Sequence, residues 1–548
     1  MDRRKFVRVT AVAGTAALTS KPLTAEVPSV GDHPATAKAQ PFRVAPFALE
    51  ETTVADLQAR MASGRTTAHA ITQAYINRIR ELDHAGPMLR HVIEVNPDAL
   101  SIAAALDRER KAGHVRGPLH GIPVLVKDNI DTADRMTTTA GSYALAGSIP
   151  LQDSTVAAKL RAAGAIILGK TNLSEWANFR SSHSSSGWSG RGGQAKNPYV
   201  LDRNPCGSSS GSGGAVSANL STLAVGTETD GSIVCPSSAN GVVGIKPTLG
   251  LISRAGIIPI AHSQDTAGPM TRTVRDAAIL LGVLSGVDPR DSATSASNRP
   301  GTIDYATFLD ANGLRGARIG VARAKFFGYS DVTDKLINDA IDVMKRQGAV
   351  IVDPADIATA GKFDDTEFDV LLYEFKTDLN AYLASLGPRA PVKSLADIIA
   401  YNDAHKDQEM PYFGQEIMIQ AQAKGPLTEK KYLDALANDI KQSRADGIDA
   451  TMDKYKLDAI VAPTGSPAWT TDLINGDHFS GASSTPAAVA GYPNINVPAG
   501  FSHNLPVGIS FFGRAYSEPT LIKLAYAYEQ ATKHRRPPRF IPTLGDAG

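Results

Sequence analysis

Apolar and polar residues follow two patterns along the chain, and each pattern predicts one kind of secondary structure. Apolar residues spaced three or four positions apart predict amphipathic helices at residues 54–61, 68–82, 98–111, 155–163 and 332–346. Short, nearly continuous apolar runs predict buried strands at residues 122–126, 165–168, 221–225, 318–321, 349–352, 459–462 and 506–512. Helices that alternate with buried strands indicate an α/β fold, with a central mixed, mostly parallel sheet covered by helices on both faces.

The first 25 residues are organised differently from the rest of the chain. Asp2, Arg3, Arg4 and Lys5 precede an apolar stretch of small residues at 7–18. A charged start, a short apolar core and a small-residue exit are typical of an export signal, and the paired arginines favour the twin-arginine type. A disordered basic tail is the alternative interpretation. The export signal predicts a periplasmic or secreted bacterial protein.

The remaining chain divides into a linker and one folded domain. Residues 26–50 are rich in Pro and Ala without periodicity, and we interpret them as the linker. Residues 51–548 are expected to form the folded domain, in which the mainly helical region from about 363 to 455 is a cap or an insertion. No run after the export signal approaches the roughly 20 apolar residues of a membrane span, so we expect no stable span.

Charge and cysteine content narrow the classes of partner and cofactor. The chain has 56 Lys and Arg against 55 Asp and Glu, whereas nucleic-acid-binding proteins usually carry a clear basic excess. We therefore expect no nucleic-acid partner. Cys206 and Cys235 are the only cysteines, and no C-x-x-C or His-rich spacing suggests a metal site. They can form a disulfide only if their Cα atoms lie within about 7 Å, which the sequence leaves open.

Two familiar motifs match the sequence without the local structure that they require. Residues 164–171 match the phosphate-binding loop G-x-x-x-x-G-K-[ST], but Ala-Ile-Ile-Leu at the loop positions predicts a strand, so nucleotide binding is not expected. Residues 207–211 match G-x-S-x-G, but a polar segment with Pro205 precedes them instead of a strand. A Ser-His-Asp triad stays an alternative, because His183 and His262 lie among serines.

Two further segments carry a lysine and a serine-rich run in unusual settings. Lys127 directly follows an apolar run, which draws it towards the interior, although its stem can also pack on the sheet with the ammonium in water. Residues 206–214 are Gly- and Ser-rich and lead into an apolar helix expected at 215–220. That position between ordered segments favours an ordered loop over a flexible one.

A third segment, residues 226–236, follows a predicted strand and precedes small residues that can start a helix. Its central turn contains Thr229, Asp230, Gly231 and Ser232. Successive backbone N–H groups in such a turn can hold an oxyanion, with Ser232 at its mouth. A serine that only caps the following helix is the alternative.

Together, these segments resemble the amidase signature family, and the resemblance runs from about residue 50 to the end. It implies the amidase signature fold for the catalytic domain, Lys127 as the base, Ser208 as a bridging serine with a cis peptide bond, and Ser232 as the nucleophile, 24 residues after Ser208. Further matches lie at residues 241–248, 265–270, 491–493 and 505–508. Three positions depart from the usual family pattern: Asp230 and Ser210 replace glycines, and Val234 replaces an arginine.

These departures, with residues 205–210 and 257–260, are most similar to bacterial peptide amidases. The resemblance therefore implies hydrolysis of carboxylic amides through an acyl-serine intermediate, with the C-terminal amide of peptides as substrate and ammonia as product. It implies no metal or organic cofactor, water as co-substrate, and a monomer or homodimer. A general aliphatic or aryl amidase is the nearest alternative. Alternatives of other classes are a non-catalytic binding protein on the same fold and an amidotransferase subunit.

The chemistry sets one further requirement on Lys127. A serine hydroxyl is a poor nucleophile until a base takes its proton, and lysine can serve as that base only when it is neutral. The ordinary lysine pKa of about 10.4 must therefore fall to about 7. Burial behind an apolar strand lowers a lysine pKa and can produce a shift of that size.

Overall fold

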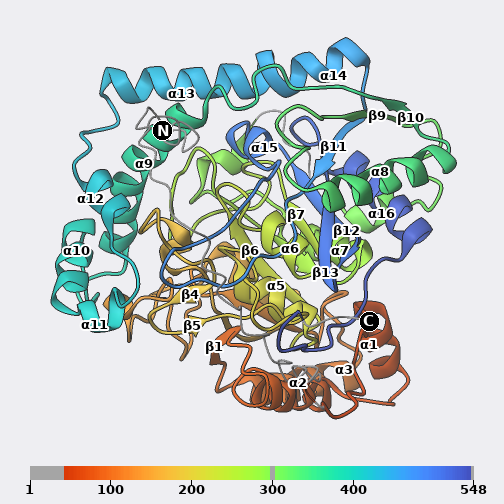
Figure 1. Ribbon diagram of the computed structural model, residues 1–548. Coiled ribbons are helices and arrows are strands. Elements are labelled where there is room, and N and C mark those ends of the chain that lie inside the picture. Colours follow the sequence, from red (N-terminus) through yellow and green to blue (C-terminus); the bar gives the residue numbers. More distant parts are fainter. Residues whose placement is uncertain (1–41, 43, 297–302, 545–548) are drawn as a thin grey trace, which may run out of the picture. The chain divides into compact units, whose positions relative to one another are not determined.

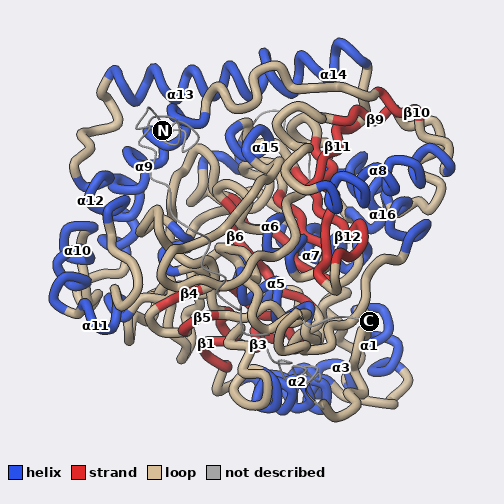
Figure 2. Tube along the Cα trace, in the orientation of Figure 1, coloured by secondary structure: helices blue, strands red, loops and turns tan. Residues whose placement is uncertain are grey.

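A computed structural model describes residues 42, 44–296 and 303–544, and its main body spans residues 39–548 (Figure 1). The predicted export signal and most of the predicted linker lie outside the described residues. The body contains one eleven-stranded sheet in the order β1-β3-β2-β6-β8-β7-β12-β13-β11-β9-β10. Figure 2 shows these strands running through the interior, with helices around them. The predicted α/β fold, a large mixed sheet with helices on both faces, is confirmed.

The strands of this sheet include all seven runs that hydrophobicity predicts, together with four that it misses. The predicted runs correspond to β2 (Pro123–Lys127), β3 (Ile166–Thr171), β6 (Leu223–Glu228), β9 (Arg318–Val321), β10 (Val350–Val352), β11 (Ala459–Pro463) and β13 (Leu505–Phe512). The additional strands are β1 (Val92–Val95), β7 (Val243–Lys246), β8 (Thr266–Thr271) and β12 (Asn494–Ser502). A separate two-stranded sheet joins β4 (Trp188–Ser189) and β5 (Gly193–Gln194).

Strand direction divides the large sheet into parallel flanks and an antiparallel centre. β3, β2 and β6 pair in parallel, and so do β10, β9 and β11. The edge strand β1 pairs antiparallel with β3. The ladders between these flanks run through β8, β7, β12 and β13 and are antiparallel. Most of the strands missed from the sequence therefore belong to the antiparallel centre.

Helices cover the sheet in two layers. In one layer, α5 contacts β3, β2, β6 and β8, and its neighbour α6 contacts β7, β12 and β13. In the other layer, α4, α7, α16 and α8 contact one another in that order. Thr53 and Thr67 cap α1 and α2 through their side chains, as their positions before the apolar periodicity predict. The helices up to residue 346 are α1 (Val54–Ala62), α2 (Ala68–Leu82), α3 (Ala99–Lys111), α4 (Thr155–Ala162), α5 (Ser210–Ser217), α6 (Val234–Ala239), α7 (Val274–Leu284) and α8 (Asp331–Arg346).

The start of α5 corrects the expectation of a Gly/Ser loop that leads into a helix at residues 215–220. The helix begins at Ser210, inside the Gly-rich run, and ends at Ser217. Close packing explains the glycines, because a Cβ on Gly211 would lie 2.4 Å from the His91 carbonyl oxygen, and one on Gly214 would lie 2.1 Å from the His91 ring. Tertiary packing thus overrides the low helix propensity of glycine.

Helices fill the region from residue 364 to residue 455. α9, α10 and α12 pack in a hydrophobic cluster of their own, which includes Phe375, Trp176 and Ile258. This region therefore closes over loops of the main sheet. No helix in the described part of the chain is long and apolar enough to cross a membrane. The remaining helices are α9 (Asp364–Ser385), α10 (Leu395–Ala404), α11 (Lys406–Glu409), α12 (Glu416–Gln422), α13 (Lys430–Ser443), α14 (Asp449–Tyr455), α15 (Thr485–Val489) and α16 (Glu518–Thr532).

Candidate active site

Lys127 is the last residue of β2, a strand with every residue buried. Its side chain is 0% exposed, so the interpretation with the ammonium in water is wrong. Lys127 Nζ lies 2.8 Å from Ser208 Oγ, 2.8 Å from Thr227 Oγ1 and 3.2 Å from the Thr227 carbonyl oxygen. These contacts join the end of β2 to the end of the neighbouring strand β6 and to the segment before α5.

Burial dominates the electrostatics of Lys127. Loss of water lowers the pKa of the Lys127 ammonium from its ordinary value to about 7, while the carboxylates of Asp265 and Glu228 oppose that shift. A neutral amine, which has two N–H groups and one lone pair, can form all three contacts, as can an ammonium with three N–H groups. The N–H groups can donate to the two Thr227 oxygens, which leaves the lone pair for the Ser208 hydroxyl.

Ser208 follows a cis peptide bond, Gly207–Ser208, and its side chain is 0% exposed. A Cβ on Gly207 would lie 2.1 Å from Ser174 Oγ, so only glycine fits before this serine. The next residue, Ser209, donates its backbone N–H to the Ser232 carbonyl oxygen at 3.1 Å. The serine segments are therefore adjacent, although the Ser208 and Ser232 hydroxyls form no hydrogen bond with each other in the described structure.

The turn between β6 and α6 presents a row of unpaired backbone donors. Among the described residues, the N–H groups of Thr229, Asp230, Gly231 and Ser232 donate to no acceptor, and the Ser232 hydroxyl has no partner. Gly231 has φ +78°, which favours glycine at this bend. Ser232 is 8% exposed. Because α6 begins at Val234 with Ile233 at its N-cap, the interpretation of Ser232 as a helix cap is wrong.

Buried carboxylates hold this turn in shape. Glu228 Oε2 accepts the N–H groups of Ile233 at 2.7 Å and Val234 at 3.0 Å, and thereby satisfies the first donors of α6. Asp265 Oδ1 accepts the Thr229 hydroxyl at 2.6 Å. Burial raises the pKa of the Asp265 carboxyl to about 6.

Asp230, which replaces the usual glycine, contacts the first residue of α15. Its Oδ2 accepts the Thr485 hydroxyl at 2.6 Å. The Asp230 carboxylate is thereby linked to a residue 255 positions away in the sequence.

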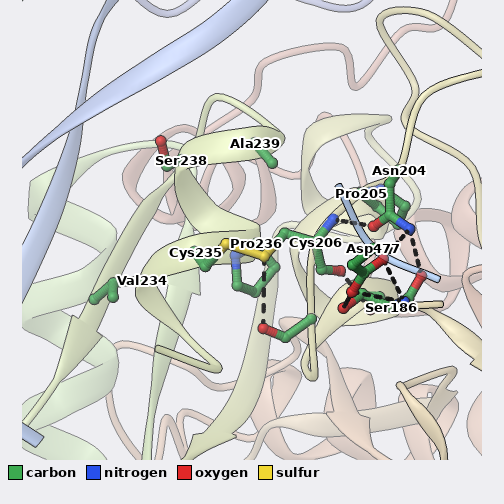
Figure 3. The surroundings of a disulfide bond; sticks show 12 residues. Ser186, Asn204, Pro205, Cys206, Val234, Cys235, Pro236, Ser238, Ala239 and Asp477 are labelled. Atoms are coloured by element: carbon green, nitrogen blue, oxygen red, sulfur yellow. Dashed lines mark hydrogen bonds between the residues drawn. A yellow bond between two sulfur atoms is a disulfide. The ribbon is translucent and has the colours of Figure 1, made fainter. Parts of the chain in front are cut away.

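A disulfide connects the segment that contains Ser208 to the segment that contains Ser232. Cys206 and Cys235 are bonded, with Cα atoms 6.0 Å apart, which answers the question that the sequence left open. Figure 3 shows this bond between the segment before Ser208 and the start of α6. On the other side of Cys206, Asp477 accepts hydrogen bonds from Ser186 N at 3.0 Å and Asn204 Nδ2 at 3.2 Å.

A cavity of about 360 Å³ opens beside the residues that contact Lys127 and the turn that contains Ser232. Thr227 and Thr229 line it at the end of β6, and Tyr382 of α9 lines it from the helical region. Its apolar walls come mainly from the segment before β8, through Ile257, Ile258, Pro259 and Ile260. The helical region at 364–455 therefore contributes one wall of a space that reaches the turn with Ser232.

The alternatives that the sequence left open do not assemble at this turn. His183 contacts Glu416, and His262 Nδ1 lies 2.8 Å from Asp378 Oδ2; neither histidine contacts Ser208 or Ser232. The Walker-like residues form β3 as predicted, and Lys170 Nζ donates to Ile130 O and Thr138 Oγ1.

His262, Glu374 and Asp378 are the one group of potential metal ligands found in the described part of the chain. Glu374 already accepts the Ser263 N–H and the Tyr432 hydroxyl. These carboxylates are thus occupied by protein donors, and we assign no metal to them.

Sequence reasoning missed three residues next to Lys127: Thr227, Asn129 and Asp265. Thr227 and Asn129 are linked, because Asn129 Nδ2 donates to Thr227 Oγ1 at 3.0 Å. The available signal was their position, since Asn129 comes two residues after Lys127 at the end of β2, and Thr227 lies at the end of β6. Polar residues at the ends of adjacent parallel strands meet at one edge of a sheet.

Comparisons with known proteins agree with this geometry. The family model described as Amidase matches residues 70–522. A native peptide amidase from Stenotrophomonas maltophilia is 52% identical, with a TM-score of 0.87 over 90% of this chain and 100% of that chain. A probable amidase of Arabidopsis thaliana is 45% identical over 90% of this chain and 93% of its own length. A glutamyl-tRNA(Gln) amidotransferase subunit of Chloroflexus aurantiacus is 34% identical over 90% of this chain and 99% of its own. The protein therefore belongs to the amidase signature family and is an amide-hydrolysing enzyme.

Proposed function

We propose that this protein hydrolyses the C-terminal amide of peptides and releases ammonia through an acyl-Ser232 intermediate. One observation carries the proposal: a buried lysine with a pKa of about 7 contacts Ser208, and the neighbouring turn from Thr229 to Ser232 has four backbone N–H groups without an acceptor among the described residues. A base, a bridging hydroxyl and an oxyanion site are the parts that acyl transfer to serine requires.

The proton route follows from the contacts of Lys127. The neutral amine accepts the Ser208 proton as Ser208 accepts the Ser232 proton, and Ser232 Oγ attacks the amide carbon. The carbonyl oxygen becomes an oxyanion, which the N–H groups of Thr229 to Ser232 stabilise. The relay then returns the proton to the amide nitrogen, ammonia leaves, and an ester remains on Ser232. Water repeats the sequence, and the products are a carboxylic acid and free Ser232.

The substrate class rests on the size of the two halves of the amide. Ammonia needs almost no space, so a cavity of about 360 Å³ beside the turn serves the acyl half. Its apolar walls suit an amino-acid side chain. The solved relative at 52% identity is named a peptide amidase, which supports the same class for this chain. A short peptide amide thus fits better than a small aliphatic amide.

Ammonia release by the purified chain tests this function. We expect rapid release from short peptide amides, slower release from aryl and fatty amides, and no cleavage of internal bonds in the same peptides. The purified chain working alone also separates this proposal from the amidotransferase role, which the 34% identity to the Chloroflexus protein brings into consideration. Turnover of aryl amides without turnover of peptide amides would overturn the peptide assignment and leave a general amidase.

We also propose export through the twin-arginine route, on the basis of Arg3 and Arg4 and the apolar stretch after them. The Cys206–Cys235 disulfide supports an oxidising destination, because disulfides persist in the periplasm and outside the cell.

A further inference from the structure

Asn129 carries an unused hydrogen-bond acceptor next to the proposed catalytic groups. Its side chain is 2% exposed, and its buried Oδ1 atom has no hydrogen-bond partner among the residues that the structure describes. Its Nδ2 donates to Thr227 Oγ1 at 3.0 Å and lies 3.4 Å from the Ile258 carbonyl oxygen. Because that carbonyl can only accept, the nitrogen must face it. The orientation of the amide is thus decided by the protein, and the oxygen is left unpaired.

An unpaired buried acceptor is costly. Other buried side-chain atoms of the described residues also lack a partner, but Asn129 is the one residue among them that lines the main cavity. Asn129 lines the cavity of about 360 Å³ together with Thr227, Thr229 and Ile258. Thr227 contacts Lys127 Nζ, and Thr229 begins the turn that ends at Ser232. Asn129 therefore belongs to the part of the cavity wall that Thr227 and Thr229 also form, where a ligand in the cavity can supply the donor that its buried oxygen lacks.

The chemistry of the substrate identifies that donor. In a peptide amide, a backbone N–H is separated from the scissile carbonyl carbon by one Cα atom. The acyl half occupies the cavity, whereas the leaving ammonia needs no cavity of its own. Fatty and aryl acyl groups have no N–H at this position, so they would leave Asn129 Oδ1 unpaired.

We propose that Asn129 Oδ1 accepts a hydrogen bond from the backbone N–H of the residue that bears the scissile amide, and thereby selects peptide acyl groups. This inference rests on the proposed function and adds a specificity residue to it. Asn129 takes no part in proton transfer; it binds the acyl half and favours only those acyl groups that carry a donor at that place.

A matched pair of substrates tests the inference. N-acetyl-leucinamide has the N–H, and its isostere with CH2 in place of that N–H does not. We expect the wild-type enzyme to hydrolyse the first with kcat/KM about tenfold higher, the value of one buried hydrogen bond. Asn129→Ala should bring the ratio close to one. Tyr382→Phe is the matched control: its hydroxyl donates to Asp131 Oδ1 at 2.8 Å, so its loss should keep the wild-type preference.

A conservative variant separates recognition from a structural role. Asn129→Asp keeps an acceptor oxygen and should keep the preference for the N–H substrate. Its added negative charge stabilises the Lys127 ammonium, so the acid limb of kcat/KM should move to higher pH. Loss of the preference in Asn129→Asp would contradict the inference.

Two other outcomes would overturn the inference: equal hydrolysis of the two substrates by the wild type, and an Asn129→Ala variant that lowers both rates by the same factor. The ratio of the two kcat/KM values of the wild type tests the first outcome, equal hydrolysis, even if Asn129→Ala fails to fold. Absence of ammonia from both substrates would overturn the proposed function, and this inference with it.

Discussion

Lys127 and Ser208 lie 81 residues apart in the sequence, yet Lys127 Nζ is 2.8 Å from Ser208 Oγ and both side chains are 0% exposed. The contact exists because β2 and β6 are parallel neighbours and α5 begins against their ends. Burial lowers the pKa of Lys127, and proximity directs its lone pair at one hydroxyl.

Lys127→Ala should lower kcat by about 10²- to 10⁴-fold, because the proposed relay loses its base. Ammonia release measures the effect, and thermal unfolding confirms that the variant folds. Lys170→Met is the matched control, since Lys170 is equally buried on the neighbouring strand β3 but contacts Ile130 and Thr138. The control should keep the acid limb of the pH profile, whereas near-wild-type activity in Lys127→Ala would exclude the relay.

The wild-type kcat/KM should fall about tenfold per pH unit below the Lys127 pKa of about 7, because the protonated amine cannot accept a proton. Asp265→Asn should move this acid limb to lower pH. The Asp265 carboxylate raises the pKa of Lys127, so its removal destabilises the ammonium and lowers that pKa further. A limb that stays in place or moves to higher pH in Asp265→Asn would contradict this electrostatic account.

An activated acylating inhibitor should modify Ser232, because its hydroxyl and the four backbone N–H groups of residues 229–232 have no partner among the described residues. Peptide mass spectrometry after proteolysis locates the adduct. Ser232→Ala should remain unlabelled. Ser208→Ala should label more slowly on the same residue, because Ser208 only transfers the proton. An adduct on Ser208 or Ser209 instead would show that the roles of the serines are assigned incorrectly.

Replacing both Cys206 and Cys235 by serine should lower the free energy of unfolding by about 3 to 4 kcal/mol, the value expected for a disulfide that closes a loop of this length. Urea unfolding with and without a reductant measures the loss. The reductant should destabilise the wild type and leave the double variant unchanged. A reductant effect of equal size in both proteins would show that the disulfide is not its origin.

If the proposed export route is correct, changing Arg3 and Arg4 to lysine should retain the enzyme in the cytoplasm of an expressing bacterium, because a twin-arginine signal is recognised through its arginine pair. Cell fractionation followed by the ammonia assay measures the distribution. Unchanged periplasmic activity in the double variant would contradict this route of export.

Local patterns in the sequence were sufficient to predict many of the helices and strands. The apolar run before Lys127 predicted a buried strand, and the apolar spacing at residues 54–61 and 68–82 predicted two helices. Such signals are visible because a buried strand or an amphipathic helix requires its own residues to be apolar at fixed positions. The strands β8 and β12 escaped prediction, since they contain Gly and Pro and depend on their neighbours for pairing. Gly268 of β8 is needed because a Cβ there would lie 2.0 Å from the Ile245 carbonyl oxygen.

By itself, the sequence determined the family and the α/β class, and it singled out Lys127, Ser208 and Ser232 as the candidate catalytic residues, because residue type and order along the chain carry that information. Only the tertiary structure decided how these residues meet. It placed the Lys127 ammonium out of water, joined Cys206 to Cys235, started α5 within the Gly-rich run and left Asn129 Oδ1 without a donor. Each of these depends on contacts between segments far apart in the chain, and burial, pKa and hydrogen-bond satisfaction are properties of such contacts and not of any one segment.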